Sequence, residues 1–160
     1  ILEGKDIYRL SDDERSRLRN RKIGFIFQLY HLLAEFTALE NVLLPALVQG
    51  QSENPQSLET RALDLLDRVG LSARVGHKPY QLSGGEQQRV AIARSLINDP
   101  KIIFCDEPTG NLDSETGEEI IELLMALNKT HRQTLVVVTH DEKIAKRSHQ
   151  ILHMRDGRLV

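Results

Sequence analysis

The most chemically suggestive residues of the sequence are two adjacent acids, Asp106 and Glu107, which follow the apolar run 102–105. Ligands of open α/β sheets bind beyond the carboxyl ends of the strands, where these two acids are expected to lie. We predict that Asp106 holds Mg²⁺ through water and that Glu107 orients or deprotonates an attacking water. Taken alone, the same pair also fits a simple surface turn.

A second motif, LSGGEQQR at 82–89, places a serine and two glycines at the start of a predicted helix. Glycine lets backbone N–H groups approach an anion closely, and the helix N-terminus carries partial positive charge. Ser83, Gly84 and Gly85 are therefore predicted to face a phosphate group. Glu86 stands three residues after Ser83, which is the spacing of a capping box. The alternative is a flexible turn before an ordinary helix.

The elements that position these motifs are indicated by local patterns. Capping boxes that begin at Ser11, Thr37 and Ser83 predict three helices. Apolar residues at helical spacing predict further helices over 58–69 and 120–127. Because proline interrupts helical hydrogen bonding, we expect Pro45 to kink or shorten the helix that follows Thr37.

Strands are predicted at the short apolar runs 23–27, 102–105 and 135–139. Their lack of alternation indicates strands buried on both faces of a parallel sheet. Asp156-Gly157 predicts a hairpin between two C-terminal strands. The stretch from 36 to 80 is nearly all helix, so the predicted fold is α/β, with a helical subdomain inserted into a parallel sheet core.

Composition narrows the possible partners and compartments. The 160 residues carry a formal net charge of -2, which gives no strong field toward nucleic acid, and we expect no nucleic-acid partner. The lone Cys105 excludes an internal disulfide. No apolar run approaches the roughly 18 residues of a membrane-spanning helix. A basic cluster, which we interpret as a solvated helix face, comprises Arg15, Arg17, Arg19, Arg21 and Lys22.

Together these motifs resemble those of the ABC ATPases, and the resemblance covers essentially the whole chain. LSGGEQQR is similar to the ABC signature, and the run 102–107 is similar to a Walker B motif followed by a catalytic glutamate. Gln28 resembles the Q-loop glutamine, 111–113 resembles the D-loop, and His140 resembles the switch histidine of the H-loop. The family fold is that of P-loop NTPases, a RecA-like parallel sheet with an inserted helical subdomain. Glutamate at position 86, in place of the commonest glutamine, occurs in some family branches.

The resemblance also implies roles for these residues in ATP hydrolysis by a head-to-tail homodimer. Gln28 and Asp106 would contact Mg²⁺, and Gln28 would couple to the membrane subunit. Glu107 and His140 would be catalytic, with His140 at the γ-phosphate, although a histidine at a strand end is otherwise often structural. In the dimer, Ser83, Gly84, Gly85 and Glu86 would complete the partner's ATP site, and Asp113 would link the two sites.

The segments 27–33 and 36–42 resemble a subgroup that contains the bacterial lipoprotein-releasing, macrolide-export and cell-division ATPases. We expect a subunit that powers lipoprotein release through integral membrane permeases, located peripherally at the cytoplasmic face of the bacterial inner membrane. Macrolide-type efflux and cell division are the alternatives. Soluble ABC ATPases of translation or DNA repair are a further rival, but they usually carry tandem domains or long insertions.

The phosphate-binding Walker A motif, G-x-x-x-x-G-K-[ST], does not occur in the 160 residues. In the family it lies upstream of the segment that Ile1 begins. We therefore expect an N-terminally truncated fragment that lacks part of the sheet core. Its expected parts are core at 1–35, helical subdomain and signature helix at 36–98, and core with the Walker B, D-loop and H-loop at 99–160. A degenerate relative, acting as a non-catalytic half-site binding module, is the alternative.

We predict that the 160-residue chain by itself binds ATP very weakly and does not hydrolyse it. The amides and lysine of a P-loop neutralise the β- and γ-phosphates, whereas Asp106 and Glu107 bring only negative charge to an anionic ligand. Phosphate release from ATP by the purified chain is the measurement. Clear saturable hydrolysis would contradict the prediction.

Overall fold

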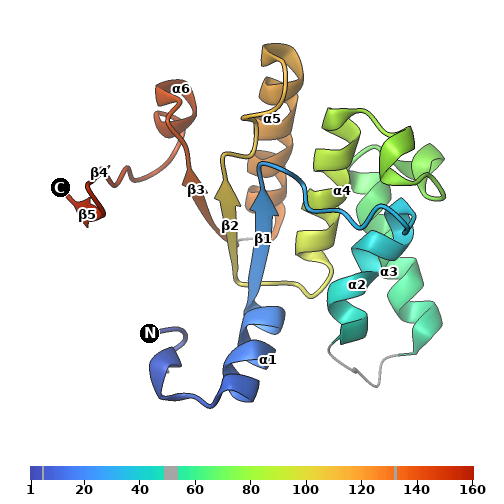
Figure 1. The fold of residues 1–160 in the computed structure, drawn as a ribbon, viewed down its shortest axis with the longest axis horizontal. Helices are drawn as coiled ribbons and strands as arrows, with labels where there is room; N and C mark the ends of the chain where they lie inside the picture. Colours follow the sequence, from blue (N-terminus) through green and yellow to red (C-terminus); the bar gives the residue numbers. More distant parts are fainter. Residues whose placement is uncertain (5, 49–53, 132) are drawn as a thin grey trace.

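The computed structural model describes residues 1–4, 6–48, 54–131 and 133–160, and its centre is a parallel sheet of three strands (Figure 1). These are β1 (Ile23–Phe27), β2 (Ile102–Asp106) and β3 (Thr134–Val138). They pair in the order β1-β2-β3, with Phe25, Phe104 and Val136 side by side in register. The three apolar runs of the sequence thus form strands as predicted.

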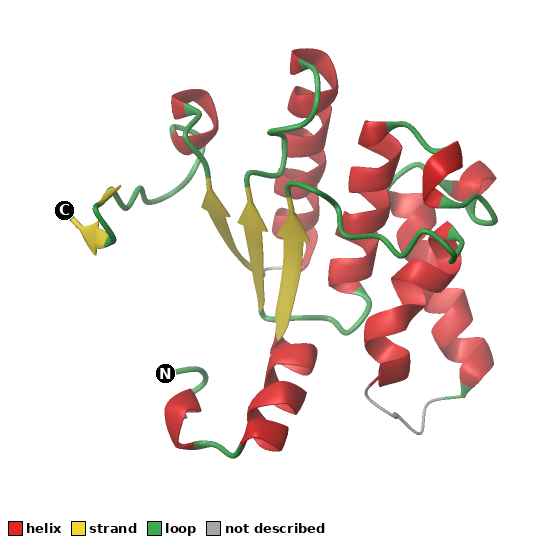
Figure 2. Cartoon of the chain, in the orientation of Figure 1, coloured by secondary structure: helices red, strands yellow, loops and turns green. Residues whose placement is uncertain are grey.

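Helices make the connections between the strands. Those between β1 and β2 are α2 (Ala38–Val48), α3 (Pro55–Arg68), the 3₁₀ turns η2 (Ser72–Arg74) and η3 (Pro79–Gln81), and α4 (Gly84–Leu96). Figure 2 shows α2, α3 and α4 grouped to one side of the sheet. The link from β2 to β3 is α5 (Ser114–His131). Within the described ranges, every helix is too short or too polar to span a lipid bilayer.

The ends of the chain carry small elements. Before β1 stand η1 (Ile7–Arg9) and α1 (Asp12–Lys22), and α1 runs directly into the strand. After β3 come α6 (Glu142–Ala145) and the antiparallel pair β4 (Met154–Arg155) and β5 (Arg158–Leu159). Asp156 and Gly157 both have positive φ, 49° and 74°, as the two turn residues of a type I′ hairpin require. The predicted C-terminal hairpin is therefore confirmed.

The predicted helix starts are confirmed at atomic level. At the start of α1 the Ser11 hydroxyl accepts from the Glu14 N–H, and the Glu14 carboxylate accepts from the Ser11 N–H. Ser83 and Glu86 make the same reciprocal pair at α4. The shortening expected at Pro45 is wrong, because α2 continues three residues beyond it, and the kink that was the other expected outcome stays a prediction.

One face of the sheet packs against the hydrophobic core. Ile26, Ile103 and Cys105 are buried and belong to one cluster with residues of α4 and α5. The cluster extends through α4 to α2 and α3, where Val42 and Leu66 are fully buried. Core packing therefore joins the sheet to the helices that follow β1.

The opposite face of the sheet corrects the prediction that both faces are buried. Phe25 is 41% exposed and Val138 is 57% exposed, so this face is partly open to solvent. The rings of Phe25 and Phe104 stack there with centroids 5.8 Å apart. The exposure of this face cannot be predicted from the sequence, because the strand residues on it are as apolar as those on the buried face.

Gly24 sets how closely β1 packs on α4. A Cβ at this position would lie 2.6 Å from the Ser95 carbonyl oxygen, which is part of the helix backbone. Backbone cannot move aside as a flexible side chain does, so a larger residue would push β1 and α4 apart.

We predict that Gly24→Ala lowers the free energy of unfolding by about 1–3 kcal/mol, the usual cost of overpacking. The matched control is Gly76→Ala, because nothing lies within 4 Å of a Cβ there. Urea denaturation of both variants is the measurement. Equal losses from the two substitutions would contradict the steric argument.

Candidate functional site

Parallel register brings the predicted catalytic residues to one edge of the sheet. Phe27, Asp106 and Val138 are neighbours across the three strands. Gln28 follows the first, and His140 follows the third by two positions. Because all three strands end at this edge, their trailing residues form a common site, as in other open α/β sheets.

Glu107 is held in a strained backbone conformation at this edge. Its φ is 45°, in the left-handed region that non-glycine residues rarely adopt. The Glu107 N–H donates to the Val138 carbonyl at 3.0 Å, and the Gly110 N–H donates to the Glu107 carbonyl at 3.0 Å. These bonds fix the acid against β3 and turn the chain sharply away from β2.

The carboxylate of Glu107 faces the end of β3. Its Oε1 lies 2.7 Å from His140 Nδ1 and accepts from the His140 backbone N–H at 3.2 Å. Its Oε2 lies 3.4 Å from the Thr139 hydroxyl. The acid predicted to activate water and the predicted switch histidine are therefore direct partners.

This pairing changes the protonation of His140. The hydrogen bond with Glu107 and the charge of that carboxylate raise the pKa of His140, and the Asp141 charge adds a smaller contribution. The ring is 87% exposed, so its second nitrogen, Nε2, is open to a ligand. A protonated imidazole at this position can donate from Nε2 while Nδ1 remains with Glu107.

Asp106 and Gln28 have the chemistry that a magnesium ion requires. Asp106 is exposed at the end of β2, so its carboxylate is open to a ligand. Gln28 donates through Nε2 to Asn111 Oδ1 at 3.3 Å, which leaves its amide oxygen as an acceptor. No group of three His, Cys, Asp or Glu side chains among the described residues could enclose a metal. These two oxygens fit Mg²⁺ because that ion usually keeps waters and substrate phosphates as its other ligands.

The loop after Glu107 holds Gln28 through two hydrogen bonds made by Asn111. Asn111 Nδ2 donates to the Gln28 carbonyl at 3.1 Å, in addition to the bond between the two side chains. A Cβ at Gly110 would come within 2.6 Å of Gln28 Nε2. Asn111 was predicted only as part of the D-loop, and its contact with Gln28 joins segments 83 positions apart.

The signature residues lie at the N-terminus of α4. Ser83 and Glu86 form the capping box, and Arg74 pairs with the Glu86 carboxylate at 3.0 Å. The backbone N–H of Ser83 and then the Arg74 bond lower the pKa of Glu86. The Glu86 side chain is therefore bonded within this chain, to Ser83 and Arg74. A contact of this side chain with a nucleotide stays a prediction.

The two signature glycines also pack against neighbouring loops. A Cβ at Gly84 would lie 3.0 Å from the Tyr30 hydroxyl, and one at Gly85 would lie 2.5 Å from the Thr116 methyl. Asp113 caps α5, since its carboxylate accepts from the N–H and the hydroxyl of Thr116 at 3.0 and 2.7 Å. These bonds lower the pKa of Asp113.

Sequence reasoning missed Gln88, which connects the two groups of predicted site residues. Its side chain is fully buried, and Nε2 donates to the Pro108 carbonyl at 2.6 Å. Pro108 follows Glu107, so an amide from the signature helix braces the strained turn. The available signal was its position, one helical turn before Ile92 on the buried face of α4.

Comparison with known proteins adds a family context to this geometry. Residues 1–110 match the family model described as ABC transporter. The chain is 50% identical over 158 residues to the lipoprotein-releasing system ATP-binding protein LolD of Xanthomonas campestris pv. campestris (strain 8004), covering 99% of this chain and 65% of that protein. It is 52% identical over 159 residues to the protein of the same name from Cytophaga hutchinsonii, covering 99% and 72%.

Solved structures show the same architecture. The dimeric ATP-binding cassette MJ0796 in a post-hydrolysis state, bound to ADP and Pi, superposes with a TM-score of 0.86 and 44% identity, covering 99% of this chain and 69% of that one. A second dimeric structure of MJ0796, described as a bacterial ABC transporter cassette, gives 0.82 and 47%, covering 94% and 66%. These chains have the fold of P-loop NTPases, and so does the chain described above.

We predict that His140 titrates above the ordinary histidine pKa of about 6.5 and that Glu107→Gln lowers it toward that value. Because the folded-state pKa is raised, the pairing stabilises the fold fully below about pH 6.5 and is lost as pH rises through the folded-state pKa. NMR titration of the ring is the measurement. Asp141→Asn is the control and should lower the pKa less. An unchanged His140 titration in Glu107→Gln would sink the prediction.

Proposed function

This chain belongs to the ABC transporter family, and we propose that it is the ATP-hydrolysing part of a transporter that releases lipoproteins from the bacterial inner membrane. The observation that carries the proposal is identity of 50–52% to lipoprotein-releasing ATP-binding proteins over 99% of the chain. The chain spans 65% of the length of the Xanthomonas relatives, so the proposal concerns the whole protein.

In the proposed reaction, Glu107 accepts a proton from the water that attacks the γ-phosphorus, the bond from that phosphorus to the bridging oxygen breaks, and ADP and phosphate leave. ATP and Mg²⁺ supply the scissile phosphate and the neutralisation of its charge. Gln28 and Asp106 would hold the ion through their side-chain oxygens. His140 donates from Nε2 to a γ-phosphate oxygen, while its Nδ1 keeps the Glu107 carboxylate oriented. The distance of 2.7 Å between His140 Nδ1 and Glu107 Oε1 supports these roles for the two residues.

The signature residues are proposed to act on the nucleotide of a second, identical subunit. Two-fold symmetry makes each subunit supply both halves of the composite sites. Ser83, Gly84, Gly85 and Glu86 would present the N-terminus of α4 to the partner's phosphates, and Asp113 would stand between the two sites. The dimeric state of both similar MJ0796 structures supports this arrangement.

Membrane permeases are the second proposed partner. Immediately after Gln28 the chain exposes three large apolar side chains: Leu29 is 67% exposed, Leu33 47% and Phe36 36%. Apolar side chains gathered on one surface mark sites of protein contact. We propose that permeases bind there, which places the protein peripherally at the cytoplasmic face, and that the segment 36–98 moves against the two core segments as ATP is used.

Reconstitution tests the proposed cargo. The full-length protein would be purified with its permease subunits and placed in liposomes loaded with a lipoprotein. ATP-dependent release of that lipoprotein to a soluble acceptor is expected. ATP-dependent efflux of a macrolide without lipoprotein release would instead select the macrolide-export branch.

We predict that Glu107→Gln in this complex keeps ATP binding but slows hydrolysis by about 10²–10⁴-fold, the usual contribution of a general base. Glu59→Gln, on the exposed side of α3, is the matched control and should hydrolyse ATP at the wild-type rate. Phosphate release and nucleotide binding are measured in parallel. Wild-type turnover in Glu107→Gln would remove this residue from the proposed mechanism.

A further inference from the structure

Glu86 gives the N-terminus of α4 a negative charge that conflicts with its proposed role. A helix start carries a positive charge equivalent to about half an elementary charge, which favours an anion. Glu86 places a full negative charge in the same turn, because its Oε2 accepts from the Ser83 N–H at 2.8 Å. A carboxylate bound in this way more than cancels the positive helix end. By itself, Glu86 would therefore repel the phosphate groups that are proposed to bind there.

Arg74 supplies the opposite charge from another segment of the chain. Its Nε donates to Glu86 Oε1 at 3.0 Å, so the two oxygens of the carboxylate have different partners. Among the described residues that lower the pKa of Glu86, Arg74 is the charged one. The carboxylate is ionised at neutral pH, and the guanidinium makes the pair neutral. The partial positive charge of the helix start then remains available to an anion.

The backbone around Arg74 is fixed, so this charge is held beside α4. Arg74 is the last residue of η2, where its N–H donates to the Leu71 carbonyl at 2.8 Å and its carbonyl accepts from the His77 N–H at 2.9 Å. Leu71 is buried in the hydrophobic core. The carbonyls of His77 and Val75 accept from N–H groups in the first turn of α2, at 2.8 and 3.1 Å. The segment that carries Arg74 is therefore bonded to α2 as well as to α4.

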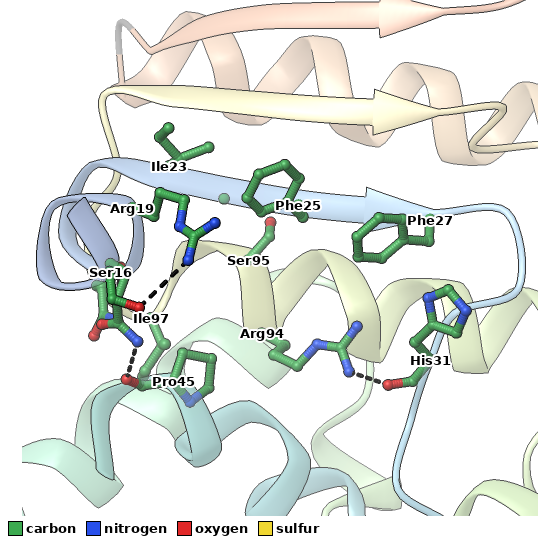
Figure 3. Close-up of a pocket in the computed structure, with 13 residues that line it drawn as sticks. Ser16, Arg19, Ile23, Phe25, Phe27, His31, Pro45, Arg94, Ser95 and Ile97 are labelled. Carbon is green, nitrogen blue, oxygen red and sulfur yellow. Dashed lines mark hydrogen bonds between the residues drawn. The ribbon is translucent and has the colours of Figure 1, made fainter. Parts of the chain in front are cut away.

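Contacts along α4 hold the position of the helix itself. Near its C-terminus, Arg94 donates to the carbonyls of Tyr30 and His31, and Figure 3 shows the second of these bonds. One turn after the signature glycines, Gln88 donates to the Pro108 carbonyl. Because both the helix and its capping carboxylate are held in place, the negative charge has to be offset where it lies.

We propose that Arg74 is a positioning residue of the signature, which acts through Glu86 to keep the N-terminus of α4 positive toward the phosphates of the partner's nucleotide. The inference rests on the composite sites proposed above. A glutamine at position 86 would also complete the capping box but carries no charge, so the arginine is needed because this residue is an acid.

The exposure of the pair determines which property it affects. The Arg74 side chain is 45% exposed and the Glu86 side chain is 28% exposed, so solvent and salt screen their attraction. Exposed ion pairs contribute little to the stability of a fold. We therefore expect loss of Arg74 to change the affinity of the helix start for an anion far more than it changes stability.

A double-mutant cycle on ATP-dependent dimerisation tests the proposal. Arg74→Gln, Glu86→Gln and the double variant are made in the full-length subunit with Glu107→Gln, so that ATP is not consumed. Sedimentation velocity gives the ATP concentration for half-maximal dimer. Arg74→Gln should raise this concentration at least about fivefold when Glu86 is present, and less than about twofold in the Glu86→Gln background. An equal increase in both backgrounds, or none in either, would overturn the proposal.

Two comparisons separate the charge effect from a loss of structure. Arg9→Gln removes an arginine whose Nε pairs with Asp6 at 3.3 Å in η1, and it should leave the ATP requirement unchanged. The ratio of the Arg74→Gln value to the parent value should shrink between about 0.1 and 1 M NaCl, because the screening length falls from about 10 to about 3 Å. A ratio that ignores salt and instead follows the urea midpoints of the variants would overturn the proposal, since Arg74 would then only hold η2 against α4.

Titration with inorganic phosphate tests the same charge without a partner subunit. Phosphate should shift the backbone amide NMR signals of Gly84 and Gly85 in the full-length protein. We expect Arg74→Gln to raise the Kd for this shift at least about fivefold, and the added change Glu86→Gln to reverse the increase. Unshifted signals in the wild type, or a Kd that Arg74→Gln leaves unchanged, would overturn the proposal. If the shifts follow the expected pattern but ATP gives no dimer, the role of Arg74 stands and the proposed composite sites fail.

Discussion

The parallel pairing of three short strands is the constraint on which the candidate site depends. Since Phe27, Asp106 and Val138 are in register, the residues after them leave the sheet at one edge. A slip of one residue would turn the side chains of a strand to the opposite face and separate Glu107 from His140. The hydrophobic core that contains Ile26 helps to fix the register of the three strands. It therefore stabilises the site as well as the fold.

The signature helix α4 contacts both the turn after Glu107 and the segment after Gln28. At its N-terminus lie the signature glycines, in its middle Gln88 braces the Pro108 turn, and near its end Arg94 holds Tyr30 and His31. α4 is one continuous helix from Gly84 to Leu96, and eight of its thirteen residues are buried. The candidate catalytic edge and the proposed permease surface are thus linked through one rigid element.

The sequence was sufficient for the local features and for the order of the elements. Capping boxes such as that of Ser83 and Glu86 involve residues three apart, so their partners are visible in the sequence. The bonds of Gln88 to Pro108 and of Asn111 to Gln28 join residues 20 and 83 positions apart and depend on the completed packing. Exposure of Val138 could not be predicted either, because an apolar strand residue has the same appearance on an open face as on a covered one.

The left-handed backbone of Glu107 implies a trade-off between stability and function at this position. A non-glycine residue in such a conformation costs on the order of 1–3 kcal/mol, and the surrounding bonds must maintain it. Glycine would relieve that cost and would also remove the carboxylate. The strained backbone at Glu107 is therefore a cost in stability that glycine would avoid only by giving up the carboxylate of the proposed mechanism.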